Sequence, residues 1–444
     1  MIAFIKKNYH YFLIFILIFC MYNYLFIDRS YADPINNYGF SYALKIGEIP
    51  YKDFNLLTTP LYAFIMSLGL FIWDNYFMFL LEQSLLVTIA FYFLNKLFGS
   101  NCYLLLLISI ILGSLVFNPT YNFMVFLLII ILLYLEKNNK NDYLIGLTIG
   151  LSILCKHTVG LFLIIPSLIF YFKDKDKIIK RIIGIVVPCF IFIIYLLITK
   201  SFYNFFDLAF LGLFDFANKN GLVSSIWFYF SIVLLIVSLI KTIKDKSNIL
   251  NYYYLLTFTI CIPIFDLCHV LYFILFIVMQ FLPYSDKKSL LFLYLLLSYV
   301  MVFIWFIQLT KVDKFTLNKG INKFQYTNNY IYHYDMIKKN HKFISKYKNP
   351  IVLSSSHYNI MYKISNNKKI DYFDILHYSN FGYNGDQKMI NRIKKMHNKY
   401  IIIDMIFYES DRSDSQYDKN IVKYIIDNYD EVCENESLHV YYLK

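Results

Sequence analysis

The sequence predicts a polytopic α-helical membrane protein with about 11 spans and a small extracytoplasmic α/β domain at its C-terminal end. Three observations predict this fold class. Hydrophobic residues make up 58% of the 444 residues, more than in a typical soluble domain. They gather in nearly uncharged runs of about 15–22 residues, close to the length that crosses a bilayer core. Short basic loops separate these runs, and the sequence becomes polar after Gln308.

The plainest apolar runs cover residues 9–27, 76–94, 103–117, 182–199 and 289–308. The first run resembles a signal peptide, since Ser30-Tyr31-Ala32 is similar to a cleavage site. It is long for the apolar part of such a peptide, so we interpret it as an uncleaved first span. A further run, residues 56–73, is just long enough to cross the membrane.

The cations of the short loops predict how the chain is threaded. One set of loops holds Lys6, Lys7, Lys96, Lys137, Lys140, Lys173, Lys175, Lys177, Lys180, Arg181, Lys241, Lys244, Lys246, Lys287 and Lys288. The opposite set holds only Arg29, Lys45, Lys52, Lys156, Lys200 and Lys219. The positive-inside rule therefore places the first set and the N-terminus in the cytoplasm, in a multi-pass protein of the cell membrane.

If residues 56–73 crossed the membrane, every later loop would lie on the opposite side. The basic loops would then face outward, against the positive-inside rule. We therefore expect a re-entrant or surface-lying helix there, within a long outer loop over residues 28–75. Pro60 suits the first turn of such a helix. The C-terminal region, residues 311–444, then also lies outside the cytoplasm, as a long translocated domain does not obey the charge rule.

Composition and spacing argue against several other classes. The net charge of +12 comes largely from loop cations, a pattern of membrane orientation and not of nucleic-acid binding. The seven cysteines have neither the spacing of a disulfide framework nor that of a zinc site. We therefore expect no cofactor, and nothing in the sequence supports a divalent metal.

The C-terminal region reads as a small α/β domain. Residues 350–353, 400–404 and 438–443 predict short strands, and residues 388–397 and 420–429 predict amphipathic helices. No P-loop and no Gly-x-Gly-x-x-Gly pattern is found there, which argues against a soluble nucleotide-sugar site in this domain.

Two positions at the outer ends of apolar runs could carry chemistry. Asp33 lies six residues beyond the first run and could take a proton from an acceptor hydroxyl, or could cap a helix that begins at Pro34. Lys156 could stabilise a departing phosphate, or could extend to the membrane surface as an interfacial lysine. His157 beside it could bind substrate or simply belong to an interfacial polar ring.

Three further side chains could contribute to substrate binding. Glu82 lies about 10 Å inside its predicted span at the helical rise, where a carboxylate suggests a function or an ion pair with a cation such as Lys156. Asp266 and His269 would share one face of a helix and could bind substrate. The simpler interpretation is a capping aspartate with an interfacial histidine.

Several motifs together resemble the GT-C-type glycosyltransferases, the superfamily of the protein O-mannosyltransferases and aminoarabinose transferases. They are Asp33 near the membrane, Gly47-Glu48-Ile49-Pro50-Tyr51-Lys52-Asp53-Phe54, Thr59-Pro60-Leu61, Gly146-Leu147 with Gly150-Leu151, Lys156-His157-Thr158-Val159-Gly160, and Pro263 to His269 with Asp266. The match follows the order and topology of residues 1–310, which would form the catalytic module.

The chain also departs from this family at three places. The relatives usually have two adjacent acidic residues at the catalytic position, whereas Asp33 is followed by Pro34, which leaves Asp28 or Asp53 as substitutes. They often have Gln after the Lys, where His157 stands here. They commonly carry Arg early in the second span, where Glu82-Gln83 stand here.

The resemblance implies a transferase that moves a sugar from a polyprenyl-phosphate donor to an extracytoplasmic glycan, lipid or protein acceptor, with inversion. Asp33 would be the general base. Lys52, Asp53, Glu82, Lys156, His157, Asp266 and His269 would bind the substrates. The alternative is a transporter or flippase of lipid-linked saccharides, although such proteins often carry internal repeats and we see none here.

Overall fold

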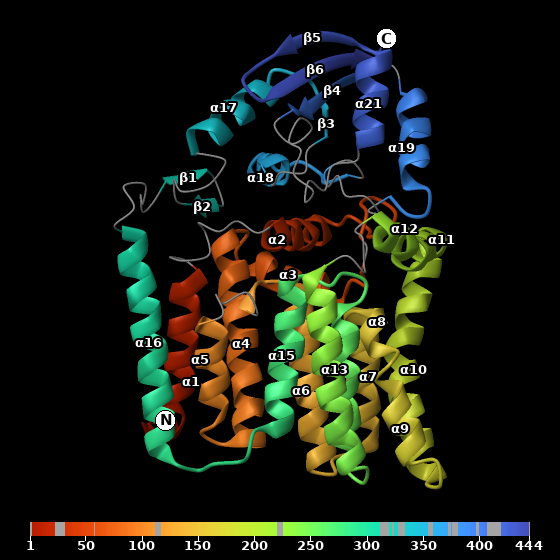
Figure 1. Ribbon diagram of the computed structural model, residues 1–444. Helices are drawn as coiled ribbons and strands as arrows, with labels where there is room; N and C mark the ends of the chain where they lie inside the picture. The colour runs from red at the N-terminus through yellow and green to blue at the C-terminus, as the bar shows by residue number, and fades with distance from the viewer. Residues whose placement is uncertain are drawn as a thin grey trace.

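The computed structural model describes residues 2–22, 32–56, 58–111, 117–219, 225–310, 319–321, 324–326, 334–353, 358–371, 374, 381–396, 399–405 and 419–443. The elements form two parts, a helical module and a C-terminal domain built around a sheet (Figure 1). The end of the module that carries the C-terminal domain is called the domain-facing end below.

One set of helices in the module stands side by side (Figure 1). They are α1 (Ile2–Met21), α4 (Tyr76–Phe98), α5 (Cys102–Ile111), α6 (Tyr121–Lys137), α7 (Asp142–Cys155), α9 (Ile164–Phe170), α10 (Lys175–Ile198), α13 (Ile226–Lys244), α14 (Ile249–Leu256) with the 3-10 turn η4 (Thr257–Cys261), α15 (Leu267–Phe281) and α16 (Lys288–Thr310). By length and composition, α4, α10 and α13 could each cross a membrane. The other helices, α1 and α16 among them, have shorter apolar stretches of 10–17 described residues, so the figure of about 11 spans stays a prediction.

Glycines let α7 and α10 approach closely. A Cβ on Gly146 would lie 2.1 Å from the carbonyl oxygen of Arg181, and a Cβ on Gly184 would lie 2.4 Å from that of Tyr143. No side chain fits at such distances, because protein interiors are close-packed. Gly146 belongs to a motif of the family resemblance, and in this structure it contacts the neighbouring helix.

A buried ion cluster joins four helices at the other end of the module. Arg181 of α10 donates to both carboxylate oxygens of Glu136 of α6, at 2.6 and 3.0 Å, and to Asp142 of α7 at 2.7 Å. The hydroxyl of Tyr253 of α14 donates to Glu136 at 2.8 Å. Arg181 is therefore not one of the loop cations with which the sequence analysis counted it, because helix packing buries its guanidinium against two carboxylates.

The remaining helices of the module occupy the domain-facing end. They are α2 (Ala32–Lys45), α3 (Leu61–Ile72), α8 (His157–Gly160), α11 (Phe202–Phe206), the π-helix η3 (Asp207–Leu211) and α12 (Gly212–Lys219). Helix α3 begins directly after Pro60, which confirms the predicted helix there. Its 12 residues span about 18 Å at the helical rise, too short to cross a bilayer core of about 30 Å.

The C-terminal domain has a four-stranded sheet with the order β3-β4-β6-β5. The strands are β3 (Ile351–Leu353), β4 (Lys399–Asp404), β5 (Asp430–Glu434) and β6 (Leu438–Leu443), and a separate hairpin pairs β1 (Lys319–Ile321) with β2 (Phe324–Tyr326). β3 and β4 are parallel, with Ile351 opposite Ile401, and the other pairs are antiparallel. The three predicted strands are confirmed as β3, β4 and β6.

Four helices accompany the sheet, namely α17 (Tyr334–Ile344), α18 (Tyr358–Ser365), α19 (Gly385–Lys394) and α21 (Lys419–Asn428). The two predicted amphipathic helices correspond to α19 and α21. Strand β5 was not predicted, because its five residues are all exposed and mostly charged, so its sequence has no apolar alternation.

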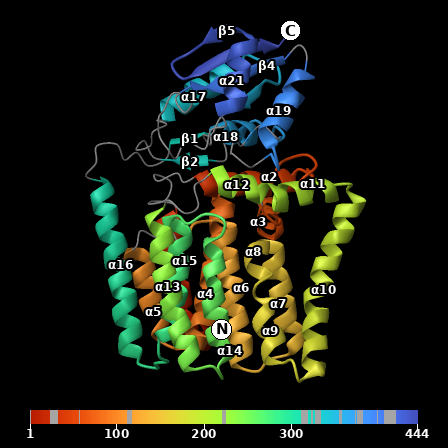
Figure 2. The same ribbon diagram turned by 45° about the vertical axis from the view of Figure 1, so that its right-hand side comes forward.

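Two sets of contacts hold the C-terminal domain on the module. At α2, Ile360 of α18 and Ile370 join the apolar core of the module, and the Ile370 amide donates to Glu48 at 3.3 Å. At η3, Lys388 of α19 forms an ion pair with Asp207 at 2.5 Å. Figure 2 shows α11 and α12 crossing the domain-facing end beneath α19. The domain therefore contacts this end of the module at two separate places.

Candidate functional site

A break between two helices places Lys156 and His157 at the domain-facing end. Helix α7 ends at Cys155, and Lys156 has extended backbone angles (φ −147°, ψ 96°) before α8 begins at His157. The chain after Lys156 packs back against α7 at Gly160. A Cβ there would lie 2.2 Å from the backbone nitrogen of Ile153, so this position requires glycine. Both Lys156 and His157 are only 3% exposed.

Lys156 begins a chain of hydrogen bonds through four side chains, called the Lys156 cluster below. Its Nζ donates to Oδ1 of Asn122 at 3.0 Å and to the carbonyl of Ile260 at 2.7 Å. Nδ2 of Asn122 lies 3.1 Å from Nε2 of His269, and Nδ1 of His269 lies 2.7 Å from Oδ1 of Asp266. The cluster therefore joins the starts of α6 and α15 to the end of α7.

The cluster has one consistent assignment of donors and acceptors. The ammonium group of Lys156 can only donate, so Oδ1 of Asn122 accepts and its amide nitrogen donates to Nε2 of His269. Nδ1 of His269 then carries the proton and donates to the carboxylate of Asp266. In this arrangement the amide of Asn122 holds the ammonium group of Lys156 in position, while Asp266 fixes the tautomer and orientation of the His269 ring.

Asp266 also caps its helix, because its carboxylate accepts from the backbone amide of His269 at 2.8 Å, as the simpler interpretation of its sequence position predicted. Burial alone would raise the pKa of Asp266. The ring and amide of His269 and the charge of Lys156 lower this pKa below its usual value. Asp266 therefore stays ionised at neutral pH, and its negative charge lies behind His269.

A pocket opens beside the cluster. It is lined by Thr58, Tyr121, Lys156, His157, Thr158, Leu213, Pro263, Ile264 and His269. The ring of His157 lies 4.6 Å from that of Phe210, centroid to centroid. Among the described residues, the ring of His157 has no side-chain hydrogen-bond partner, and only the backbone of Ala209 interacts with its nitrogens. A buried imidazole in this state can bind a polar group that enters the pocket.

The structure thus brings together four of the eight predicted site residues: Lys156, His157, Asp266 and His269. Asp33 is the second residue of α2, a helix at the same end of the module (Figure 1). The side chain of Asp33 lies outside the described residues, so its role as a base stays a prediction.

The other three predicted residues do not line this pocket. Oδ2 of Asp53 accepts from the amide of Ile49 at 2.8 Å and closes its own turn, and Lys52 beside it is exposed. Glu82 packs against α3, where a Cβ on Gly69 would lie 2.5 Å from its Oε2. Within the described residues no ion pair joins Glu82 to Lys156, which instead contacts Asn122 and Ile260.

Asn122, the central residue of the cluster, was not predicted from the sequence. One signal could have found it, since Asn122 is a polar residue in the first turn of α6, directly before the apolar stretch of residues 123–133. It is also only 4% exposed, and a buried amide usually has hydrogen-bond partners. Its link to α7 and α15 depends on how the helices pack, which no local pattern contains.

No protein-family model matches the chain, and no curated protein matches it. Among solved structures, the chain is similar to the Archaeoglobus fulgidus oligosaccharyltransferase, crystallised tethered through a disulfide bond to an acceptor peptide with the NVT sequon. The similarity has 10% sequence identity and a TM-score of 0.48, over 100% of this chain and 75% of that chain. A similarity of this size assigns neither a family nor a function to the chain.

Proposed function

We propose that this protein is a membrane glycosyltransferase that moves a sugar from a polyprenyl-phosphate donor to an extracytoplasmic acceptor. The observation that carries the proposal is the Lys156 cluster, a buried lysine oriented by neighbouring side chains at one end of an apolar helical module. The apolar helices would hold the polyprenyl chain, and the cluster would meet the phosphate. The motifs that resemble GT-C enzymes support the same activity.

In this proposal Lys156 binds the phosphate of the donor. A preorganised cation stabilises the negative charge that develops on the leaving phosphate, and it acts more strongly in a site that excludes water. His157 would donate a hydrogen bond to the same group. Asn122 and His269 keep the ammonium group in place, so that little reorganisation accompanies the reaction.

Asp33 would act as the general base. It would take the proton of the acceptor hydroxyl as that oxygen attacks the anomeric carbon of the sugar. The bond between this carbon and the phosphate oxygen breaks at the same time, and polyprenyl phosphate leaves with the electron pair. Attack from the side opposite the phosphate inverts the configuration of the anomeric carbon. The proposal needs no metal and no other cofactor.

The proposed reaction takes place outside the cytoplasm. The N-terminus would be cytoplasmic, and the domain-facing end with the C-terminal domain would lie on the opposite side of the membrane. The positive-inside rule supports this threading. This rule compares the number of cations in the short loops on the two sides of the membrane. The burial of Arg181 does not change the outcome, because several lysines remain in the same loops.

Detergent-purified protein incubated with a polyprenyl-phosphate sugar and a set of glycan, lipid and protein acceptors tests the proposal. We expect release of polyprenyl phosphate, and a loss of about 100-fold or more in the Lys156→Met variant. The control is Lys137→Met, which removes a lysine that donates to the Leu97 carbonyl at the other end of α6. Equal losses in the two variants would contradict the assigned role of Lys156.

The same assay separates an enzyme from a carrier of lipid-linked saccharides. Release of polyprenyl phosphate in detergent needs no closed compartment, so it supports a transferase. A carrier would release none in detergent, and would move the intact lipid-linked saccharide across the bilayer of sealed vesicles. Transport in sealed vesicles without release of polyprenyl phosphate in detergent would contradict the transferase and support the carrier.

A further inference from the structure

One wall of the pocket beside the Lys156 cluster is a short helical segment, residues 207–215 of η3 and α12. It is called the pocket wall below. Leu213 lines the pocket, and the ring of Phe210 lies 4.6 Å from that of His157, centroid to centroid. The backbone of Ala209 also interacts with the His157 ring. The position of this segment therefore determines how His157 is enclosed.

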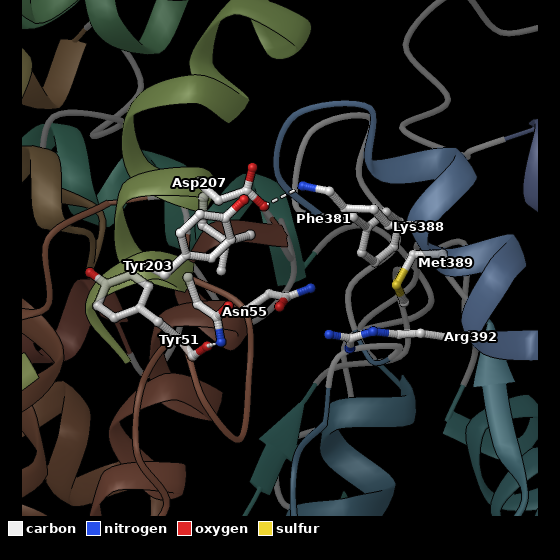
Figure 3. Close-up of a pocket in the computed structure, with 10 residues that line it drawn as sticks. Tyr51, Asn55, Tyr203, Asp207, Phe381, Lys388, Met389 and Arg392 are labelled. Atoms are coloured by element: carbon white, nitrogen blue, oxygen red, sulfur yellow. Dashed lines mark hydrogen bonds and ion pairs between the residues drawn. The ribbon is translucent and has the colours of Figure 1, made fainter. Parts of the chain in front are cut away.

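The pocket wall also carries two carboxylates that contact the C-terminal domain. Asp207 accepts from Nζ of Lys388 at 2.5 Å and from the backbone amide of Tyr383 at 3.3 Å. Asp215 accepts from the backbone amide of Asn384 at 2.7 Å. Figure 3 shows the side chain of Lys388 directed toward Asp207, where both line a pocket between the module and α19. The domain therefore holds the wall at two points.

The turn that binds these carboxylates, residues 381–384, is shaped for the contact and is called the docking turn below. Gly382 and Asn384 have left-handed φ angles of 82° and 51°, and turns of this kind direct successive backbone amides toward an anion. A Cβ on Gly382 would lie 2.2 Å from Oδ2 of Asp207, so the close approach requires glycine. Phe381 is buried in the apolar core of the C-terminal domain, and it fixes the turn to that domain.

The helix that precedes the pocket wall is attached to the module instead. Nδ2 of Asn204 in α11 donates to the carbonyl of Tyr51 at 2.9 Å. The ring of Phe205 packs edge-on against the rings of Tyr51 and Phe192. The π-helix η3 follows directly, and π-helical turns occur frequently at functional sites. The module thus holds the start of the segment, and the docking turn acts on the part that reaches His157.

We propose that the C-terminal domain positions the pocket wall through the docking turn, with Asp207 and Asp215 as positioning residues. The docked turn keeps Phe210 against the His157 ring and keeps the pocket closed to water on this side. This geometry stands on the contacts alone, whereas its effect on the donor rests on the proposed transferase function. A pocket that excludes water strengthens the attraction between Lys156 and a phosphate, so loss of the docking turn weakens donor binding.

Chemical modification of His157 tests the position of the wall without any substrate. Full-length protein in detergent is treated with diethyl pyrocarbonate, which acylates accessible imidazole nitrogens, and mass spectrometry gives the rate at each histidine. Lys388→Glu places a second negative charge against Asp207. We expect this variant to raise the rate at His157 at least about tenfold, because one charge-assisted contact is lost. An unchanged rate would overturn the proposal.

Matched variants separate the docking turn from general effects of charge. Lys395→Glu makes the same change on the same side of the domain, on an exposed side chain that does not line the pocket between the module and α19. It should leave the rate at His157 unchanged, and a rise equal to that of Lys388→Glu would overturn the proposal. Asp207→Lys combined with Lys388→Glu restores an ion pair of reversed sign. This double variant should recover most of the protection of His157, and no recovery would contradict the ion pair as the link.

His439 of β6 is an internal reference for folding of the domain, where it pairs with Glu431 and Glu434 of β5. Its rate of modification should be the same in every variant. If Lys388→Glu raises the rate at both histidines, the milder Asp215→Asn decides, because it keeps the size of the side chain and removes only its charge. A rise at His157 alone in that variant supports the proposal, and an unchanged rate overturns it.

Kinetics of sugar transfer distinguish failure of this proposal from failure of the proposed function. Lys388→Glu should raise the KM for the polyprenyl-phosphate sugar at least about tenfold, whereas a smaller folded fraction would lower kcat and leave KM unchanged. If His157 becomes accessible in Lys388→Glu but the unaltered protein transfers no sugar, the docking turn stands and the transferase is wrong. If the unaltered protein transfers sugar and Lys388→Glu changes neither the modification rate nor the KM, the transferase stands and the docking turn is wrong.

Discussion

Replacing Asn122 with leucine should destabilise the domain-facing end of the module by about 2–4 kcal/mol. Leucine is similar in size but offers no hydrogen bond. The variant leaves a buried N–H of Lys156 without its acceptor at 3.0 Å, and a hydrogen bond to a charged group contributes about 1.5–3 kcal/mol. It also removes the donor to Nε2 of His269, a neutral bond worth about 0.5–1.5 kcal/mol.

A double-mutant cycle with Lys156→Met isolates the contact between the two side chains. The free energy of unfolding is measured in mixed detergent micelles for both single variants and the double variant. We expect the loss of stability in the double variant to be smaller than the sum of the losses in the two single variants by about 1.5–3 kcal/mol. The reason is that the contact with a charged partner is already absent once Lys156 is replaced, so Asn122→Leu then removes less.

The matched control combines Asn122→Leu with Lys137→Met. These residues lie 15 positions apart on α6 (137 − 122), about 22 Å at the helical rise, so their effects should add within about 0.5 kcal/mol. Additive losses for Asn122 and Lys156 would refute the assigned hydrogen bond. Strong coupling in the control would mean that the assay reports a general collapse of the module.

Three other predictions concern the packing of the module and the seating of the C-terminal domain. Glu136→Gln should lower the free energy of unfolding by about 3–5 kcal/mol, because it leaves the buried Arg181 charge without full compensation, whereas Asp176→Asn in an exposed pair should change it by less than about 1 kcal/mol. Gly146→Ala should cost about 1–3 kcal/mol in the same assay, because its Cβ meets the backbone of α10; an unchanged stability would show that α7 and α10 do not approach so closely. Burial raises the pKa of Glu48 from 4.5 to about 7, so protonated Glu48 contributes stability that is fully present below pH 4.5 and is lost as the pH rises through about 7. Unfolding measured from pH 4 to 8 should show this loss, and Glu48→Gln should flatten the profile; an equally steep profile in the variant would assign the effect to another group.

The sequence was sufficient where local pattern determines the structure. Short apolar stretches bounded by polar residues predict β3, β4 and β6, and Pro60 marks the start of α3. Lys156 could be singled out because it ends an apolar run on the side with few loop cations, and Asp266 because an aspartate before an apolar helix suits a cap. These features need only a few neighbouring residues.

The sequence was insufficient where distant helices determine the environment. Arg181 lies in a basic segment and reads as a loop cation, yet packing of α10 against α6 and α7 pairs it with Glu136 and Asp142. Asn122 and His269 are 147 positions apart. The pocket between the module and α19 likewise depends on how two separately built surfaces meet, which no spacing along the chain specifies.

Binding of a polyprenyl phosphate that carries no sugar isolates the proposed contact between Lys156 and the phosphate. Radiolabelled lipid phosphate is titrated against the unaltered protein, Lys156→Met and Lys137→Met, each in the same detergent. We expect Lys156→Met to bind the lipid phosphate at least about tenfold more weakly, because one charge-assisted contact is lost, and Lys137→Met to bind it as the unaltered protein does. Equal affinity in Lys156→Met and the unaltered protein would contradict the contact between Lys156 and the phosphate.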